Sequence, residues 1–414
     1  MKKITLLILF LSVLSCNNDD DTIAQCNIPN NLTATNISFE SAQINWEDTN
    51  TNATYTIQYG LSGFNLGTGN TIDVSQTTLQ LTGLLANTTY DYYISSICSV
   101  SNTSMYSEVS HFTTLPPPVA SEFRPQLSQM HLYQGNIENL QPSIYTFEYD
   151  LATPLFTDYA HKQRIIAIPN GESMTYDGDG FPEFPDNTVI AKTFYYFIND
   201  NDESLGKNKI ETRVLIKQNG DWVLGNYKWN TTQTDATLDT EGATVPVTWV
   251  DTNGTTNTLA YQIPSSTDCF TCHNNADIVT PIGPKLRNLN INRNGTNQLQ
   301  ALKDRQLLSG LSNPSDVSVL PNWEDTSQPL EQRARAYFDI NCAHCHAPGG
   351  YCDEESDLDL RFETDYLNTN IFERRYLITA RTNYYIPAFS MPYIGTTMIH
   401  TEGYNLIQSY LDSL

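Results

Sequence analysis

Hydrophobic and polar positions alternate over short distances in the first part of the chain. From residue 26 to residue 115, runs of β-branched and aromatic residues are separated by Asn, Thr and Gly. This pattern is typical of an all-β sandwich, in which one face of each strand is buried. The expected strands cover residues 31–38, 42–46, 54–59, 77–81, 89–97 and 105–112.

The pattern changes twice further along the chain. Consecutive prolines at 116–118 predict a stiff linker over 116–122. Residues 123–262 then stay β-rich, with an apolar strand at 192–198 and a hairpin whose strands, 214–217 and 222–229, flank Asn219-Gly220. From residue 263 helical spacing of apolar residues appears, at 298–308, 331–338 and 404–411. We therefore expect a multidomain fold: a sandwich, a β-rich middle domain, and a mainly α region divided into segments 263–325 and 326–414.

The first residues resemble a bacterial export signal. Lys2 and Lys3 precede an apolar run over 4–13, which is too short to span a bilayer alone. The run ends in Ser15-Cys16, which resembles a lipobox, so 1–15 is the expected signal peptide, Cys16 the lipidation site and 16–25 a tether. An ordinary signal peptide with an incidental cysteine is the alternative. The expected location is the bacterial cell envelope, facing the periplasm or the cell surface, with the lipid anchor as the only membrane contact.

The net charge of the chain limits the classes of molecule that it can bind. The 414 residues carry a net charge of −24, although only 16% of them are charged. Nucleic acid and anionic lipid headgroups would be repelled, whereas a basic partner protein would be attracted. The 39% apolar and 11% aromatic content argues against disorder.

Two pentapeptides carry the clearest chemistry, and each has the form CxxCH. They are Cys269-Phe270-Thr271-Cys272-His273 and Cys342-Ala343-His344-Cys345-His346. This is the attachment signal for c-type haem: two thiols one helical turn apart reach two porphyrin vinyl groups, and the histidine that follows ligates iron. We therefore expect two covalent haems c, with Cys269, Cys272, Cys342 and Cys345 as attachment sites and His273 and His346 as proximal ligands.

Zinc and dithiol redox chemistry are the competing interpretations. A zinc site built from both CxxC pairs would need them close together, and they are far apart in the sequence. A thioredoxin-like CxxC belongs in a βαβ context, which the pattern does not predict here. Cys352 has no evident partner and is expected to be a small buried residue or a free thiol.

The sequence predicts a sixth iron ligand more clearly for the second haem than for the first. Met391-Pro392 resembles the ligand loop of small cytochromes c, so Met391 is the expected ligand of the second haem, with Met398 as the fallback. The first motif is followed by Gly283-Pro284, where cytochromes c place a proline carbonyl that accepts the hydrogen bond of the proximal imidazole. No methionine lies between the two motifs, so its distal ligand must come from elsewhere or be missing. The candidates are His161, which is preferred, and His131, Met130, Met174 and His400.

Cationic side chains are also expected at the haems. Arg287, Arg361 and Arg381 are candidate partners of haem propionates, with surface salt bridges as the alternative role. His344, inside the second motif, is expected to face solvent or a propionate.

Two family resemblances rest on larger sets of residues. Residues 26–115 resemble a fibronectin type III domain, with Trp46 at its core tryptophan and Leu84–Tyr90 (LLANTTY) at its tyrosine corner. That topology implies a disulfide between Cys26 and Cys98. Residues 123–414 resemble exported dihaem c-type cytochromes of unassigned role, through PLFTDYAHKQR, KTFYYFI, IETRVLI, PIGPKLRNLN, NCAHCH and SMPYIG.

Together these observations predict an exported, lipid-anchored dihaem cytochrome that transfers electrons to or from a redox partner protein. One alternative is a peroxidase-like enzyme whose first haem lacks a sixth protein ligand. A second is a surface binding protein with auxiliary haems, which exposed Trp222, Tyr227 and Trp229 would favour.

Overall fold

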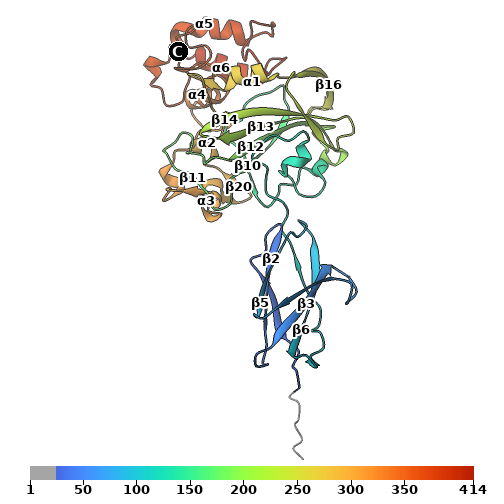
Figure 1. Cartoon of the computed structure of the whole chain (residues 1–414). Helices are drawn as coiled ribbons and strands as arrows, with labels where there is room; N and C mark the ends of the chain where they lie inside the picture. Colours follow the sequence, from blue (N-terminus) through green and yellow to red (C-terminus); the bar gives the residue numbers. More distant parts are fainter. Residues whose placement is uncertain (1–24) are drawn as a thin grey trace, which may run out of the picture. The chain divides into compact units, whose positions relative to one another are not determined.

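The computed structural model describes residues 25–414, which divide into two compact units after Pro117 (Figure 1). The expected signal peptide, the lipidation site Cys16 and nearly all of the tether lie outside the described residues. Within residues 25–414, no helix combines the length and apolar character that crossing a bilayer requires.

The first unit is a sandwich of two antiparallel sheets, as the alternating pattern predicts. One sheet has the order β1-β2-β5; the other has the order β4-β3-β6-β7, with β8 also paired to β6. The strands are β1 Asn30–Thr35, β2 Ser41–Glu47, β3 Thr54–Leu61, β4 Asn70–Val74, β5 Thr78–Thr82, β6 Thr89–Ser99, β7 Asn102–Thr103 and β8 Ser110–Thr113. The alternation of β2, with Ala42, Ile44 and Trp46 buried, places one face of each sheet in a common core.

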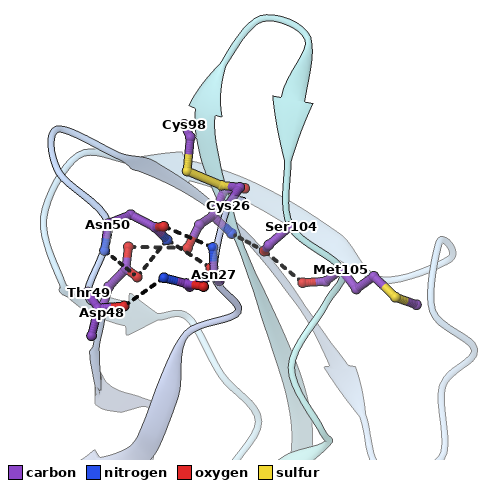
Figure 2. The surroundings of a disulfide bond; sticks show 9 residues. Cys26, Asn27, Asp48, Thr49, Asn50, Cys98, Ser104 and Met105 are labelled. Carbon is purple, nitrogen blue, oxygen red and sulfur yellow. Dashed lines mark hydrogen bonds between the residues drawn. A yellow bond between two sulfur atoms is a disulfide. The ribbon is translucent and has the colours of Figure 1, made fainter. Parts of the chain in front are cut away.

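The residues that carried the resemblance occupy the expected places in this sandwich. Trp46 is buried and lies edge-on to Tyr55. The Tyr90 hydroxyl accepts a hydrogen bond from the Leu85 amide, 2.9 Å away, and so closes the tyrosine corner. Cys26 and Cys98 form the predicted disulfide. Figure 2 shows that Asn27, next to the disulfide, exchanges two hydrogen bonds with Asn50.

The disulfide closes a loop with a sequence separation of 72 residues. A cross-link of this span restricts the unfolded chain, so replacing Cys26 and Cys98 with serine should lower the free energy of unfolding of the sandwich by about 4 kcal/mol. Urea denaturation followed through Trp46 fluorescence, in a background where the tryptophans of the second unit are replaced by phenylalanine, measures this change. An unchanged midpoint would show that the disulfide contributes nothing.

The second unit is built on one six-stranded antiparallel sheet with the order β15-β14-β13-β12-β10-β9. Its strands are β9 Thr146–Glu148, β10 His161–Ala167, β12 Val189–Phe197, β13 Lys207–Gln218, β14 Asp221–Trp229 and β15 Ala236–Asp239. A separate hairpin joins β16 Ala243–Val250 to β17 Thr256–Ile263. The predicted turn between β13 and β14 is confirmed: Asn219 and Gly220 both have positive φ.

Both faces of this sheet are covered. Ile165, Val214 and Tyr227 belong to the face that packs on residues 119–140. Ile166, Ile190 and Leu215 belong to the opposite face, which packs on residues 286–317. Trp222, Tyr227 and Trp229 are all buried, so they form no exposed aromatic row.

Helices occupy less than half of residues 263–414, so this region is less helical than predicted. They are α1 Ser266–His273, α2 Leu286–Leu289, α3 Gln298–Asp304, α4 Leu330–Asn341, α5 Ile371–Thr382 and α6 Thr401–Leu411. The second unit as a whole also contains short 3-10 turns, at Leu127–Met130, Ile137–Asn139, Glu203–Leu205, Pro314–Asp316 and Tyr366–Asn368. Its two-residue strands form three pairs: β11 Met174–Thr175 with β22 Leu308–Ser309, β18 Asn274–Asn275 with β19 Ile278–Val279, and β20 Asn292–Arg293 with β21 Thr296–Asn297. Pro, Gly, Asn and Ser are frequent between the helices, as in 310–329, and interrupt helical structure there.

Candidate functional site at the two CxxCH segments

The first CxxCH motif lies on a single helix, α1. Ser265 begins the helix with a capping box, because its hydroxyl accepts from the Asp268 amide while Asp268 accepts from the Ser265 amide. Cys269 and Cys272 therefore lie one turn apart, and His273 is the last helical residue. This is the spacing that two thioether bonds to one porphyrin require.

His273 is oriented by the chain that follows it. Its Nδ1 lies 2.6 Å from the Thr280 carbonyl oxygen, which can only accept, so Nδ1 carries the proton and Nε2 keeps its lone pair. Burial lowers the pKa of His273 to about 3, which keeps the ring neutral. The sequence assigned the accepting carbonyl to Pro284; the structure assigns it to Thr280, because the β18–β19 turn folds back onto the end of α1.

The second motif begins where α4 ends. The amides of Cys342 and Ala343 both donate to the Phe338 carbonyl, and the His346 amide donates to Cys342, so the backbone makes one tight turn. His346 Nδ1 is buried, and no protein atom in residues 25–414 accepts a hydrogen bond from it. His346 therefore lacks the partner that Thr280 provides to His273, and no protein hydrogen bond at Nδ1 orients its ring.

A cavity of about 380 Å³ opens beside the second motif. Cys342, Cys345, His346 and Met391 all line it. Met398 is not among its lining residues; the Met398 amide instead donates to Asp158. The structure thus brings Met391, and not the fallback Met398, to the second motif.

The cavity wall is largely apolar and partly open. Leu358, Leu360 and Ile378 form its inner side, while Tyr351, Leu377 and Tyr393 are about half exposed. Exposed apolar side chains around a cavity mark an interaction site.

The two motifs lie against one another. The Ala276 amide donates to the Gly349 carbonyl over 2.7 Å, and the Asn275 side chain donates to the Pro348 carbonyl. The segments that follow the two motifs are therefore paired directly, although they are far apart in the sequence.

Three thiols meet at this contact. Cys345 is hydrogen-bonded to both Cys272 and Cys352. The bond from Cys345 lowers the pKa of Cys272 to about 5, with His344 acting in the same direction. Sequence separation was therefore a wrong reason to reject zinc. Within residues 25–414, however, no group of three or more His, Cys, Asp or Glu side chains has the arrangement of a metal site.

His344 was expected to face solvent or a propionate. It lines both the cavity at the second motif and a smaller one at the first, and its buried Nδ1 has no partner within residues 25–414. It lies between the motifs instead of facing solvent. Its position inside a CxxCH segment was the sequence signal that His344 belongs to the site. Only the contact between the two motifs shows that His344 lies between them.

A second, smaller cavity of about 50 Å³ lies at the first motif. Cys269, Cys272, His273, Lys192 and Arg213 line it. Burial, reinforced by Arg164 and Arg213, lowers the pKa of Lys192 to about 7. No methionine lines this cavity, and its only histidines are His273 and His344.

The candidate distal ligands proposed for the first haem lie elsewhere. His161 lines neither cavity, and its Nε2 is 2.9 Å from Asp200. Met130 and Met174 are buried in the two sheet cores, and His131 contacts the Pro118 carbonyl. His400 stacks on Phe156 and bonds Tyr337. His161 lies away from the first motif because β10 directs its side chain to the sheet face opposite α1.

The predicted propionate partners separate into two groups. Arg381 lines the larger cavity. Arg361 pairs with Asp359, and Arg287 is buried between Asp339 and Glu363; neither arginine lines either cavity.

Asp339 is the centre of a buried ion cluster that joins α2 to α4. It accepts from Lys285 at 2.8 Å and from Arg287 at 3.1 Å. Burial alone would raise the pKa of Asp339, but the two cations outweigh it and hold the pKa below its usual value. The resulting stability is present above the unfolded pKa, about 4, and is lost as the pH falls through the lower folded pKa.

Replacing Asp339 with asparagine should therefore lower the free energy of unfolding of the second unit by about 3 kcal/mol, since Lys285 loses its carboxylate partner and the buried Arg287 keeps only Glu363. Glu122→Gln, which breaks an exposed pair with Arg124, is the matched control and should cost less than about 1 kcal/mol. Urea denaturation at pH 7 compares the two. Equal effects would contradict the structural role of Asp339.

Comparison with known proteins bears on the first unit. Similar solved structures include a computationally redesigned β-sandwich protein, with 26% identity over 22% of this chain and 96% of that chain and a TM-score of 0.20. The fibronectin type III domain of human contactin 1 shows 18% identity over 23% of this chain and 82% of that chain, with a TM-score of 0.21. The corresponding domain of the human collagen alpha-1(XX) chain shows 21% identity over 24% and 95%, with a TM-score of 0.22. No curated protein matches the chain. The fibronectin type III family model matches residues 27–113, and the chain therefore contains a fibronectin type III domain there.

Proposed function

We propose that the second unit carries two covalently attached c-type haems and that the protein transfers electrons through them. The observation that carries the proposal is the contact between the two CxxCH segments, one of which opens on a cavity that also contains Met391. A bound haem supplies an iron that gains or loses one electron. The protein's own residues would hold the porphyrin and ligate the iron.

The second motif fits a haem well. Its cavity of about 380 Å³ lies within the range of small-molecule sites, about 300–1,000 Å³, and is largely apolar. Cys342 and Cys345 would attach the porphyrin, His346 would ligate the iron, and Met391 would complete the coordination. The place of His346 in the wall of this cavity, together with Cys342, Cys345 and Met391, supports this role.

At the first motif, the side chains that would hold a haem fit better than the cavity does. Cys269 and Cys272 lie one turn apart, and the bond to Thr280 leaves Nε2 of His273 for iron. Its cavity of about 50 Å³ is smaller than a porphyrin needs, so the cavity in this structure does not accommodate a haem. His344 is the other histidine of this cavity and becomes the candidate sixth ligand in place of His161.

The contact between the motifs supports direct electron exchange. Cys272 and Cys345, each an attachment site, are hydrogen-bonded neighbours. Two porphyrins attached at these cysteines would have their edges close together, and an electron could pass between them without a mobile carrier.

A second candidate function is a peroxidase-like enzyme. It is favoured by one observation, the lack of methionine among the residues that line the first cavity. If His344 does not bind the first iron, that iron has an open position for a small substrate. The alternative function as a surface binding protein loses its support, an exposed aromatic row, because Trp222, Tyr227 and Trp229 are buried.

The setting of the protein follows from the sequence. We place it in the bacterial cell envelope, anchored through lipid on Cys16, with the fibronectin type III domain as a spacer or adhesive module. A net charge of −24 would steer a basic redox partner towards it. Such steering weakens as salt rises, because exposed charges are screened over about 10 Å at 0.1 M.

The absorption spectrum in alkaline pyridine tests the proposal, after expression in a host that matures cytochromes c. We expect a c-type signature with two haems per chain. In the untreated protein, two low-spin haems favour the electron carrier, and a high-spin component favours the enzyme. A protein that contains no haem after maturation would refute both.

A further inference from the structure

Four cationic side chains gather on one face of the six-stranded sheet, next to the first motif. They are Lys162 and Arg164 of β10, Lys192 of β12 and Arg213 of β13. In the register of the sheet, Arg164 lies directly opposite Lys192, and Lys192 lies directly opposite Arg213, so the side chains share a face. The ammonium and guanidinium groups of Lys162, Lys192 and Arg213 lie 5.5, 5.6 and 4.4 Å from the centre of the Phe194 ring.

Among the described residues, only one of the four cations in this cluster, Arg213, forms an ion pair. Arg213 forms an ion pair with Glu211, whose side chain is fully buried, at 2.5 Å. Within residues 25–414, no carboxylate lies within salt-bridge distance of Lys162, Arg164 or Lys192. Two further carboxylates lie nearby without forming an ion pair to the cluster: Asp158 accepts hydrogen bonds from Thr397 and Met398, and Asp268, which lines the same cavity as Lys192, accepts from Ser265.

The imbalance is unexpected in this chain. It contains 46 acidic residues against 22 Lys and Arg, so a carboxylate partner for each cation would be easy to supply. Arg164 is only 8% exposed, and Nε of Arg213 is buried with no hydrogen-bond partner in the described residues. Burying unpaired like charges costs several kcal/mol for each ion, unless the lysines lose their protons or an anion binds among them.

The cluster also opens on a space of suitable size. Lys192 and Arg213 line the cavity of about 50 Å³ that contains Cys269, Cys272 and His273. A water occupies about 30 Å³ in the liquid, so the cavity admits a group of a few atoms and no larger ligand. A planar guanidinium beside an ammonium suits a carboxylate or another small oxyanion.

We propose that Lys192 and Arg213, supported by Lys162 and Arg164, bind an oxyanion beside the first CxxCH motif. The oxyanion has two possible sources: the carboxylate groups of a porphyrin attached at Cys269 and Cys272, or a free small oxyanion. The first source rests on the proposed haem function; the second does not.

The test uses the full-length matured protein and three variants. Lys192→Met removes a central cation, and Lys192→Arg retains the charge. Lys217→Met is the matched control, because it removes a cation from the same face of β13 outside the cluster. For each protein, haem attachment is checked by mass, both midpoint potentials are measured, and acetate and inorganic phosphate are titrated calorimetrically at constant ionic strength.

The two sources give different results. If porphyrin carboxylates occupy the cluster, Lys192→Met shifts the potential of one haem downwards, because a nearby cation favours the reduced state, and neither acetate nor phosphate binds the wild type. If a free oxyanion occupies it, the wild type binds acetate or phosphate, and Lys192→Met weakens that binding about tenfold or more. In both cases Lys192→Arg and Lys217→Met resemble the wild type.

Unchanged potentials together with no anion binding by the wild type would overturn the proposal, even in a protein that carries both haems. A protein without covalent haem would instead refute the proposed function, and the anion titration would still decide whether the cluster is a binding site.

Discussion

Replacing Cys342 and Cys345 with alanine is expected to remove one of the two haems and leave the other. The two thiols lie on one backbone turn beside the larger cavity, and they are the atoms that would bond the porphyrin. Without them the apolar wall around Met391 has nothing to retain a haem through purification. The haem content per chain, measured from the pyridine spectrum, should fall from two to one.

The reciprocal variant, Cys269→Ala with Cys272→Ala, should remove the other haem and leave the methionine-ligated one. Cys352→Ala is the matched control, because this thiol is hydrogen-bonded to Cys345 but lies outside both motifs. It should retain both haems. Retention of two haems in either double variant would show that the corresponding motif does not attach one.

Replacing Met391 with alanine should abolish a low-spin, methionine-ligated signal while both haems stay attached. Met391 lines the larger cavity together with His346, so its sulfur is available as the sixth ligand. Histidine–methionine coordination raises the reduction potential of a haem, so its loss should also lower the potential of that centre. Near-infrared and visible spectra of the oxidised protein report the ligand, and a redox titration reports the potential.

Met398→Ala provides the comparison, because Met398 lies outside that cavity. Its spectrum should match the wild type. If Met391→Ala leaves the spectrum unchanged and Met398→Ala alters it, the two assignments must be exchanged.

Local patterns were enough to predict most of the strands. Alternating residues identified β2, and Asn219-Gly220 identified the β13–β14 hairpin, because both signals depend on neighbouring residues alone. Several elements were missed, and two of them show why. β4, Asn70–Val74, is a short polar edge strand with little apolar alternation. In α5, Ile371–Thr382, only Ile371 and Ile378 are buried, so its apolar periodicity is weak.

The site was predictable only where its signal is local. Each CxxCH segment and Met391 could be read from a few adjacent residues, and the structure brings Met391 to the second motif. His344 and the cationic cluster could not be predicted, since they depend on which strand faces meet and on how two distant segments pair. The same dependence explains why sequence separation misjudged the distance between the two CxxC pairs.

Mass spectrometry of the matured protein tests the central claim most directly. We expect an intact mass increased by two haems, with one found on the peptide that contains Cys269 and Cys272 and the other on the peptide that contains Cys342 and Cys345. A chain of unmodified mass, or one whose cysteines at these positions hold zinc, would contradict the account.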